Sequence, residues 1–332
     1  MYCLLVTLFV VIFAVYKLFE HQRGKTMIEN TNNRHVLITG CDSGFGNELA
    51  RLLDKRGVPV FAACLKEKGA AELKKHTSSR LRVLQLDVTD QNSIHDSVEF
   101  VKRHLPKCSG LWGLVNNAGL QILEAPLEFH SSEAIQKCIS VNLLGSIDVT
   151  KSFLPLLRKT RGRLVFVSSD SAIIEWPCRA PYVISKVGLE AIAECLRREL
   201  YHVGVTSHTI QPGSFKTKIV DPNEMKSTLQ RAFDNVDEEV QQYYGQQWLS
   251  KLKESFSEIP GIQYEDLSPV TNAMYHALFS VMPKRRYRCG MDCEYYYYPV
   301  SLLPEWFNTW YWKMSPPPDS VTRVDNQVIK NH

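Results

Sequence analysis

The chain has 332 residues, of which 44% are hydrophobic and 22% charged, and its formal net charge is only +4. This composition excludes an intrinsically disordered protein, because it supplies enough apolar surface for one large core with a small appendage. The small, dispersed charge argues against a nucleic-acid-binding protein, and the one basic run, Pro283–Arg288, is typical of a solvated surface or a headgroup contact. The nine cysteines show no paired metal-ligand or disulfide spacing, so we expect reduced thiols and no metal site.

The N-terminal segment is the most distinctive part of the composition. Residues 2–16 carry no charge, and Leu18 and Phe19 extend the segment to about 27 Å as a helix, close to the thickness of a bilayer core. A cleaved signal peptide is the alternative, but no basic segment precedes the apolar run and no clear cleavage site follows it. We therefore expect a retained membrane anchor over residues 1–19, and the basic residues after it place the main domain in the cytoplasm.

Short apolar runs alternate with helical patterns after a polar linker over residues 20–33. The run His35–Thr39 predicts a buried strand, and Gly46–Gly57 has apolar residues at helical spacing before a glycine stop. Later apolar runs, each separated by enough residues for a crossover helix, end at Cys64, Val88, Asn117, Ser169 and Gln211. The pattern predicts an α/β protein with a single Rossmann-type, doubly wound parallel sheet and helices on both faces. Ligands of such sheets bind beyond the carboxyl ends of the strands.

A glycine-rich loop, Thr39–Gly46, lies between the first predicted strand and the first predicted helix. Gly40, Gly44 and Gly46 allow a tight turn that brings backbone amides and the helix N-terminus against a pyrophosphate. Their spacing differs from the commoner Gly-x-Gly-x-x-Gly, and a glycine-rich loop alone is a weak signal. A bound dinucleotide is the expected ligand if other residues support it.

Tyr182 and Lys186 lie four residues apart, so on a helix they share one face. A phenol titrates near pH ~10 in water, and a neighbouring ammonium lowers its pKa. The pair can therefore supply a general base near neutral pH. In isolation the same spacing is more often structural than catalytic.

These features occur in register with others, and together they resemble the short-chain dehydrogenase/reductase family over residues 34–290. The motifs that carry the resemblance are Thr39–Gly46, Leu86–Asp90, Asn116–Gly119, Asn142, Ser169, Tyr182–Lys186 and Gln211–Thr217. Within the family, "GCDSGFG", "LWGLVNNAG", "SFLPLLRKTRGR" and "SPVTNAMYHAL" resemble the membrane-associated branch. That branch contains retinol dehydrogenases, 17β-hydroxysteroid dehydrogenases of type 2 and type 6, 11β-hydroxysteroid dehydrogenase type 2 and mitochondrial 3-hydroxybutyrate dehydrogenase.

The resemblance implies a catalytic role for four residues. Tyr182 would be the general base in alcohol oxidation and the general acid in the reverse reaction. Lys186, together with the positive charge of an oxidised nicotinamide, would lower the pKa of the tyrosine, and Lys186 would also hold the nicotinamide ribose. Ser169 would hydrogen-bond the substrate oxygen, and it is preferred over its neighbouring serines because it has the family's spacing to Tyr182. Asn142 would keep a helix locally open and hold a water in a proton relay.

The resemblance also implies a cofactor surface. The residues expected to contact the dinucleotide are Gly40, Ser43, Gly44, Phe45, Gly46, Cys64, Asp87, Val88, Asn117, Ala118, Gly119, Tyr182, Lys186, Pro212, Gly213 and Thr217. No acid stands at Cys64, where NAD-binding relatives often have one, and Lys66 and Lys68 could bind a 2′-phosphate. Against this, Ser43 stands where NADP-dependent relatives commonly carry a basic residue, and the branch mostly uses NAD. We expect NAD, with NADP as the alternative.

The C-terminal third indicates the substrate class. Residues 216–265 have amphipathic helical patterns in the position of the family's substrate lid. Residues 293–314 are dense in aromatics and prolines, which suits either a membrane interface or core packing. With the anchor, these features favour a lipophilic substrate. The catalytic domain is expected over residues 34–315, followed by a disordered tail over residues 316–332.

The expected function is hydride transfer between NAD and a secondary or allylic alcohol of a retinol-type or hydroxysteroid-type substrate. The alternatives are an NADPH-dependent carbonyl reductase, a 3-hydroxybutyrate-type dehydrogenase and a non-catalytic dinucleotide-binding membrane protein. The resemblance further implies the endoplasmic reticulum membrane, with the catalytic domain facing the cytoplasm, and a homodimer, which is common in the family.

Overall fold

The computed structural model describes residue 15 and residues 24–216, 222–255 and 264–314. The predicted anchor, apart from Val15, and the predicted tail lie outside these ranges, so both stay predictions. In the described ranges no helix combines the length and the apolar character that crossing a bilayer requires.

A seven-stranded parallel sheet forms the centre of the molecule. Its strands are β1 (Val36–Ile38), β2 (Val60–Cys64), β3 (Leu81–Gln85), β4 (Gly113–Asn116), β5 (Arg163–Val167), β6 (Thr206–Pro212) and β7 (Arg286–Cys289). They are arranged in the order β3-β2-β1-β4-β5-β6-β7, and every neighbouring pair is parallel. The predicted doubly wound sheet is thus confirmed, and the first six strands coincide with the predicted apolar runs, with β6 extending one residue further, to Pro212.

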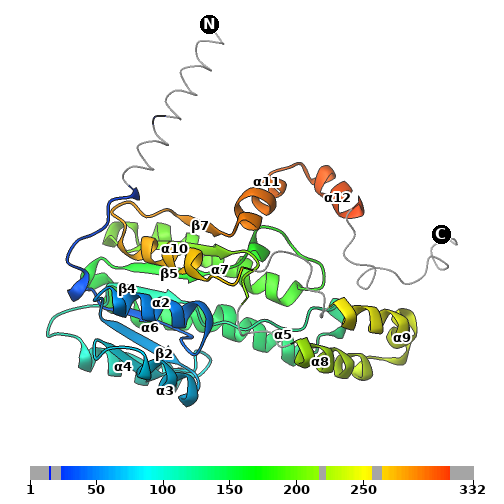
Figure 1. The fold of residues 1–332 in the computed structure, drawn as a ribbon, viewed down its shortest axis with the longest axis horizontal. Coiled ribbons are helices and arrows are strands. Elements are labelled where there is room, and N and C mark those ends of the chain that lie inside the picture. The colour runs from blue at the N-terminus through cyan, green and yellow to red at the C-terminus, as the bar shows by residue number, and fades with distance from the viewer. Residues whose placement is uncertain (1–14, 16–23, 217–221, 256–263, 315–332) are drawn as a thin grey trace, which may run out of the picture.

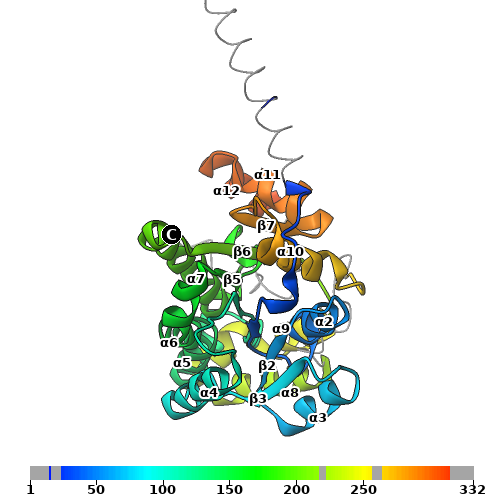
Figure 2. The ribbon, with the colours of Figure 1, turned by 90° about the vertical axis from the view of Figure 1, so that its left-hand side faces the viewer.

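Helices cover both faces of this sheet (Figures 1 and 2). One face carries α2 (Gly44–Lys55), α3 (Glu67–Lys75) and α10 (Ser268–Phe279), and the other carries α4 (Gln91–His104), α6 (Gly145–Thr160) and α7 (Ala180–Glu199). Alternation along each strand explains the two cores, because successive side chains point to opposite faces. In β1, for example, Val36 and Ile38 join the core under α2, whereas Leu37 joins the core under α6.

Two helical additions lie beyond the sheet. Helices α8 (Pro222–Asn235) and α9 (Glu238–Ser255) pack with residues 125–129 in a small separate core that includes Phe129, Phe233 and Trp248. Phe215 and Tyr264, which flank these two helices in the chain, form a β-bridge. The two ends of the inserted segment therefore lie side by side. Helices α11 (Tyr298–Ser301) and α12 (Glu305–Met314) follow β7 (Figure 1).

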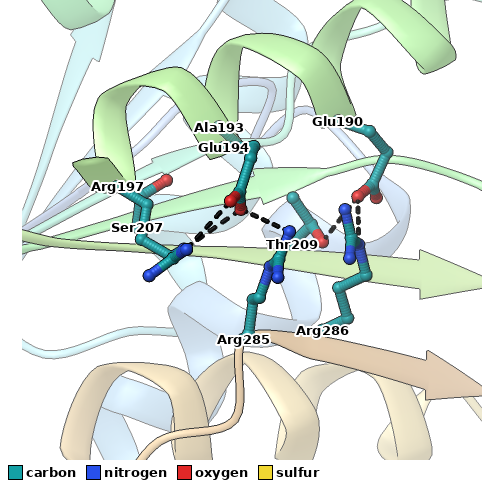
Figure 3. Close-up of a pocket in the computed structure, with 8 residues that line it drawn as sticks. All are labelled: Glu190, Ala193, Glu194, Arg197, Ser207, Thr209, Arg285 and Arg286. Carbon is teal, nitrogen blue, oxygen red and sulfur yellow. Dashed lines mark hydrogen bonds and ion pairs between the residues drawn. The ribbon is translucent and has the colours of Figure 1, made fainter. Parts of the chain in front are cut away.

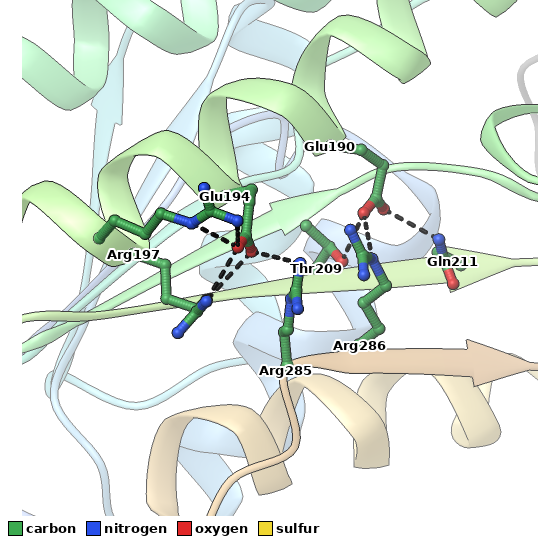
Figure 4. A network of polar contacts seen from close by, with 8 residues as sticks. Glu190, Glu194, Arg197, Thr209, Gln211, Arg285 and Arg286 are labelled. Carbon is green, nitrogen blue, oxygen red and sulfur yellow. Dashed lines mark hydrogen bonds and ion pairs between the residues drawn. The ribbon is translucent and has the colours of Figure 1, made fainter.

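The edge strand β7 was not predicted, and it takes up part of the basic run Pro283–Arg288. Arg286 donates to Glu190 at 2.8 Å, and Arg285, whose side chain is 47% exposed, pairs with Glu194 at 2.6 Å. Both glutamates project from α7 (Figures 3 and 4). The cavity between them has a volume of about 10 Å³, room for a single water, and none of the predicted site residues lines it. These four residues, Glu190, Glu194, Arg285 and Arg286, form a polar seam that attaches β7 to α7. The cavity between them is not a substrate pocket.

Candidate active site

The glycine-rich loop has the backbone shape that a pyrophosphate needs. Gly40 and Gly44 have φ values of +69° and +62°, which side chains rarely tolerate. At Gly46 a Cβ atom would lie 2.5 Å from both the Asn117 side-chain nitrogen and the Gly40 carbonyl oxygen. Ser43 precedes the first turn of α2, and its side chain makes no capping hydrogen bond to the helix. The loop thus leaves backbone amides at the N-terminus of α2 free to meet an anion.

Thr39 joins the loop to the end of β4. Its hydroxyl oxygen accepts hydrogen bonds from the backbone amides of Asn117, at 3.0 Å, and Ala118, at 2.9 Å. In return, the side-chain amide of Asn117 donates to the carbonyl oxygens of Thr39 and Gly40. These contacts fix the two loops at the carboxyl ends of adjacent strands against each other. Gly119 continues this surface, because a Cβ atom there would lie 3.6 Å from the Lys186 ammonium nitrogen.

The other expected cofactor residues contribute in different ways. Cys64 ends β2 with its side chain in the core, where burial raises the pKa of its thiol to about 12, so only its backbone faces the edge of the sheet. Asp87 accepts hydrogen bonds from the amide and hydroxyl of Thr89, and the buried Val88 packs where Gly145 allows α6 to approach.

The remaining expected contacts follow β6 and α2. Pro212 is the last residue of β6, and the amide of Gly213 donates to the Cys289 carbonyl at 2.8 Å. Phe45 packs edge-on against Phe215, with their ring centroids 5.7 Å apart. Thr217 lies outside the described residues.

Asp42 is a residue of this surface that sequence reasoning missed. Its two carboxylate oxygens accept hydrogen bonds from the backbone amides of Leu65, at 2.9 Å, and Lys66, at 2.8 Å. These amides follow directly after β2, at the position where the sequence lacks an acid. A negative charge is therefore present at the end of β2, and it comes from the glycine-rich loop rather than from β2 itself.

Asn142 lies in a π-helical turn, Ser140–Leu144, between α5 (Ser132–Ile139) and α6. The wider turn opens the helix locally, as the resemblance implied. Its fully buried side chain donates to the Leu120 carbonyl at 2.9 Å and accepts from the Leu120 amide at 2.8 Å. It also donates to the hydroxyl of Ser185 at 3.1 Å. Asn142 thus ties the loop after β4 to α7, the helix that carries Tyr182 and Lys186.

Tyr182 and Lys186 lie on the first turns of α7, which begins at Ala180 with Pro181 in a favourable first-turn position. The Lys186 ammonium nitrogen lies 5.5 Å from the centre of the Tyr182 ring and donates to the Val167 carbonyl at 2.9 Å. Burial lowers the pKa of Lys186 to about 8. The hydroxyl of Ser169, beyond the end of β5, forms a hydrogen bond with the Tyr182 side chain. Three of the four expected catalytic side chains therefore meet at one edge of the sheet.

The pKa of Tyr182 in the chain alone is set by burial. Burial raises it to about 12, because a buried phenolate loses its hydration. The expected lowering of this pKa combines the Lys186 ammonium with the positive charge of an oxidised nicotinamide, so it concerns the cofactor-bound enzyme and stays a prediction.

A family model for short chain dehydrogenase matches residues 34–227, more than half of the chain. The chain belongs to this family. The short-chain dehydrogenase motifs found in the sequence and the sheet-edge site described above lie within or directly beside the matched range.

Curated relatives cover nearly the whole chain. Retinol dehydrogenase 16 of Rattus norvegicus is 41% identical over 309 residues, which span 92% of this chain and 96% of that protein. Human retinol dehydrogenase 16 is 42% identical over 87% of this chain and 91% of its own length. The 17-beta-hydroxysteroid dehydrogenase type 6 of Homo sapiens is 40% identical, again over 87% and 91%. The predicted retinol and hydroxysteroid dehydrogenase branch is thereby confirmed.

Solved structures support the fold and the cofactor class. A short-chain dehydrogenase from Streptomyces avermitilis superposes with a TM-score of 0.67 at 21% identity and covers 85% of this chain and 96% of its own. An actinorhodin polyketide ketoreductase with NADPH has a TM-score of 0.63 at 25% identity, covering 80% and 99%. This short-chain dehydrogenase is thus an oxidoreductase that uses a nicotinamide dinucleotide.

Proposed function

We propose that this short-chain dehydrogenase oxidises a hydroxyl group of a retinol-type or hydroxysteroid-type substrate with NAD, using Tyr182 as the general base. The observation that carries the proposal is the meeting of Tyr182, Lys186 and Ser169 beside the glycine-rich loop. Binding of a dinucleotide alone would not require a base at that position. The glycines fit such a ligand, since a Cβ atom at Gly46 would collide with the loop that receives it.

The proposed mechanism follows from the positions of these side chains. The cofactor, when bound and oxidised, supplies the hydride acceptor and a positive charge next to the phenol. Tyr182 accepts the proton of the substrate hydroxyl, and Ser169 orients the substrate oxygen. Lys186, held by the Val167 carbonyl, favours the phenolate and would hold the ribose of the bound cofactor. Asn142 keeps the backbone next to Lys186 open for a proton relay through its contact with Leu120.

NAD is favoured over NADP by the position of Asp42. Its carboxylate lies against the amides of Leu65 and Lys66, where the 2′-substituent of the adenosine ribose is bound in related sheets. A carboxylate has lone pairs to spare for a 2′-hydroxyl, whereas it repels a 2′-phosphate. Lys66 and Lys68, the residues that favoured NADP in the sequence, are both exposed to solvent.

A lipophilic substrate is supported by the two additions to the sheet. The α8–α9 pair sits on residues 125–129, a segment that follows the loop bearing Gly119, and would act as a lid over the site. The segment after β7 exposes large apolar side chains: Tyr295, in the π-helical turn before α11, is 75% exposed, Leu302, directly after α11, is 67% exposed, and Trp306, in α12, is 70% exposed. Tyr297 packs instead against Trp176, so the aromatic segment serves partly as core and partly as exposed surface.

This exposed aromatic surface lies on the same side as the start of the described chain (Figure 2). There, the Gly24 carbonyl accepts hydrogen bonds from the side chains of His276, at 2.6 Å, and Ser280, at 3.1 Å. The predicted anchor would thus join the domain next to β7. We propose that α11 and α12 rest on the membrane that holds the anchor, with the endoplasmic reticulum as the branch's membrane and the domain in the cytoplasm.

Carbonyl reduction with NADPH is a second candidate, because a pKa of about 12 keeps Tyr182 protonated and suited to act as an acid. The test uses the full chain and measures alcohol oxidation with NAD and ketone reduction with NADPH on retinoid and steroid substrates. Oxidation with NAD should have the larger kcat/KM. Tyr182→Phe should bind cofactor normally and lose at least roughly 10³-fold in kcat. A Tyr182→Phe enzyme with full turnover would refute the proposal.

A further inference from the structure

Asp170 is a buried acid beside the catalytic serine that the mechanism above does not use. It follows Ser169 directly in the chain and is only 6% exposed. The Ser169 hydroxyl donates to one carboxylate oxygen of Asp170 at 2.7 Å, and the Ser171 hydroxyl makes a longer contact of 3.4 Å. An ionised carboxylate only accepts hydrogen bonds, and a serine hydroxyl has one proton. The single proton of Ser169 is therefore directed at Asp170 and away from the substrate side.

The charges around Asp170 do not neutralise it. Arg179, just before α7, faces it with a positive charge, but its guanidinium is already paired with Glu124 at 2.7 Å. From the segment after β7, Asp292 faces it with a further negative charge, and the titratable Cys293 and Tyr297 face it from the following π-helical turn. Burial raises the pKa of Asp170 above its ordinary value.

The groups that face the phenol of Tyr182 come from three elements. Lys186 lies beneath its ring on α7, Cys138 faces it from α5, and Asp170 and Arg179 face it from the two ends of the loop before α7. Burial, with a further contribution from the charge of Asp170, raises the pKa of Tyr182 to about 12. A carboxylate next to a phenol stabilises the protonated form, because the phenolate would be a second negative charge.

We propose that Asp170 is a positioning residue that keeps Tyr182 protonated and holds the hydroxyl proton of Ser169, and so sets the pH at which alcohol oxidation begins. The proposal rests on the role of Tyr182 as the general base. While Asp170 is ionised, the phenolate is disfavoured and Ser169 has no proton to offer the developing substrate oxyanion. When Asp170 is neutral, the phenolate of Tyr182 is no longer disfavoured by its charge, and the Ser169 hydroxyl is free to donate to the substrate oxygen. The negative charge of Asp170 favours carbonyl reduction, because that reaction needs a protonated Tyr182.

The test compares pH profiles of kcat/KM for oxidation of retinol and of a hydroxysteroid by the full chain. Asp170→Asn keeps the shape of the side chain and removes its charge. We expect the acidic limb of the profile to move to lower pH by roughly one unit, a gain of roughly tenfold in kcat/KM on that limb. The gain should appear in kcat rather than in KM, because the substrate pocket is unchanged.

Ser171→Ala is the matched control. It removes the other hydroxyl that contacts Asp170 but leaves the carboxylate in place, so its acidic limb should coincide with that of the wild type. A second measurement does not depend on turnover. The ultraviolet absorbance of tyrosinate is followed against pH in the wild type and in Tyr182→Phe, and the difference between the two curves is the titration of Tyr182. In the Asp170→Asn background this titration of Tyr182 should occur at lower pH. If Asp170→Asn does not fold, both measurements are made on Asp170→Ser instead.

The outcomes separate the two proposals. An acidic limb and a Tyr182 titration that both stay in place in Asp170→Asn or Asp170→Ser overturn the inference about Asp170. A loss of activity that is uniform over pH also overturns it, because that result indicates a merely structural role. Full turnover by Tyr182→Phe refutes the general-base mechanism instead.

Discussion

At the scale of single residues, burial and charge compete for control of the site. Tyr182 illustrates the competition: a lysine one turn away suggests an acidic phenol, yet desolvation raises the pKa of the phenol to about 12. Lys186 responds to the same burial, which lowers its pKa to about 8. The two pKa values thus move apart, and each shift is opposite in direction to the shift that an ion pair between the two groups would give. A further positive charge at the site is therefore needed before Tyr182 can act as a base near neutral pH.

Asp42 gives a prediction at the same scale. Asp42→Asn removes the negative charge beside the end of β2, so the preference for NAD over NADP should shrink roughly tenfold, or about 1.4 kcal/mol of binding free energy. The measurement is the ratio of the dissociation constants of the two cofactors.

Asp90→Asn is the control for this change. Asp90 caps α4 through the Asn92 amide, a role that asparagine performs equally well, and it undergoes the same loss of charge. The ratio of the NAD and NADP dissociation constants in Asp90→Asn should match that of the wild type. If this ratio in Asp42→Asn also equals the wild-type ratio, the argument for NAD is removed.

At the scale of elements, β7 depends on α7 for its position. Glu190, 9% exposed, accepts hydrogen bonds from Thr209, Gln211 and Arg286, and these link α7, β6 and β7 (Figure 4). Asp292, in the loop after β7, accepts a hydrogen bond from the amide of Ser214, the residue after Gly213, so the same seam also positions part of the expected cofactor surface. The seam therefore connects the stability of an edge strand to the geometry of the site.

Removing this carboxylate should be costly. Glu190→Ala leaves a partly buried guanidinium and two side-chain donors without their acceptor, so the free energy of unfolding should fall by about 3 kcal/mol. Urea denaturation measures the change. Arg198→Ala is the comparison, since Arg198 also pairs with a glutamate of α7 but is 73% exposed, and it should cost less than about 0.5 kcal/mol. Equal effects of the two substitutions would contradict the assignment.

At the scale of the whole molecule, the described chain is a dinucleotide-binding sheet with two additions: α8 and α9, which pack on residues 125–129, and α11 and α12, which follow β7 (Figure 1). In the described ranges, four exposed aromatic side chains lie after β7: Tyr295 and Tyr296 in the π-helical turn before α11, and Trp306 and Trp310 in α12. Trp and Tyr side chains favour the boundary between lipid and water. A substrate dissolved in the bilayer would then reach the site from the side on which the enzyme is anchored.

The double substitution Trp306→Ser and Trp310→Ser tests this arrangement. Both side chains are exposed, at 70% and 49%, so the fold should tolerate the change. We expect the KM for retinol presented in phosphatidylcholine vesicles to rise several-fold, because the domain loses its orientation on the surface, while the KM for NAD stays constant. Tyr201→Ser, which changes an exposed aromatic residue in the 3-10 turn between α7 and β6, should change neither value. An unchanged KM for vesicle-borne retinol would argue against membrane contact by α12.

The sequence by itself determined the sheet, the glycine-rich loop and the family. Short apolar runs and glycine stops are local signals, and the motif around Tyr182 has a fixed spacing within one helix. It did not show β7, because Arg285 and Arg286 look solvated until Glu190 and Glu194 are placed beside them. It also did not show Asp42 at the end of β2 or the carboxylate of Asp170 beside Tyr182. Those relations join residues that are distant in the chain or depend on burial, and only the packed tertiary structure fixes which charges share a low-dielectric neighbourhood.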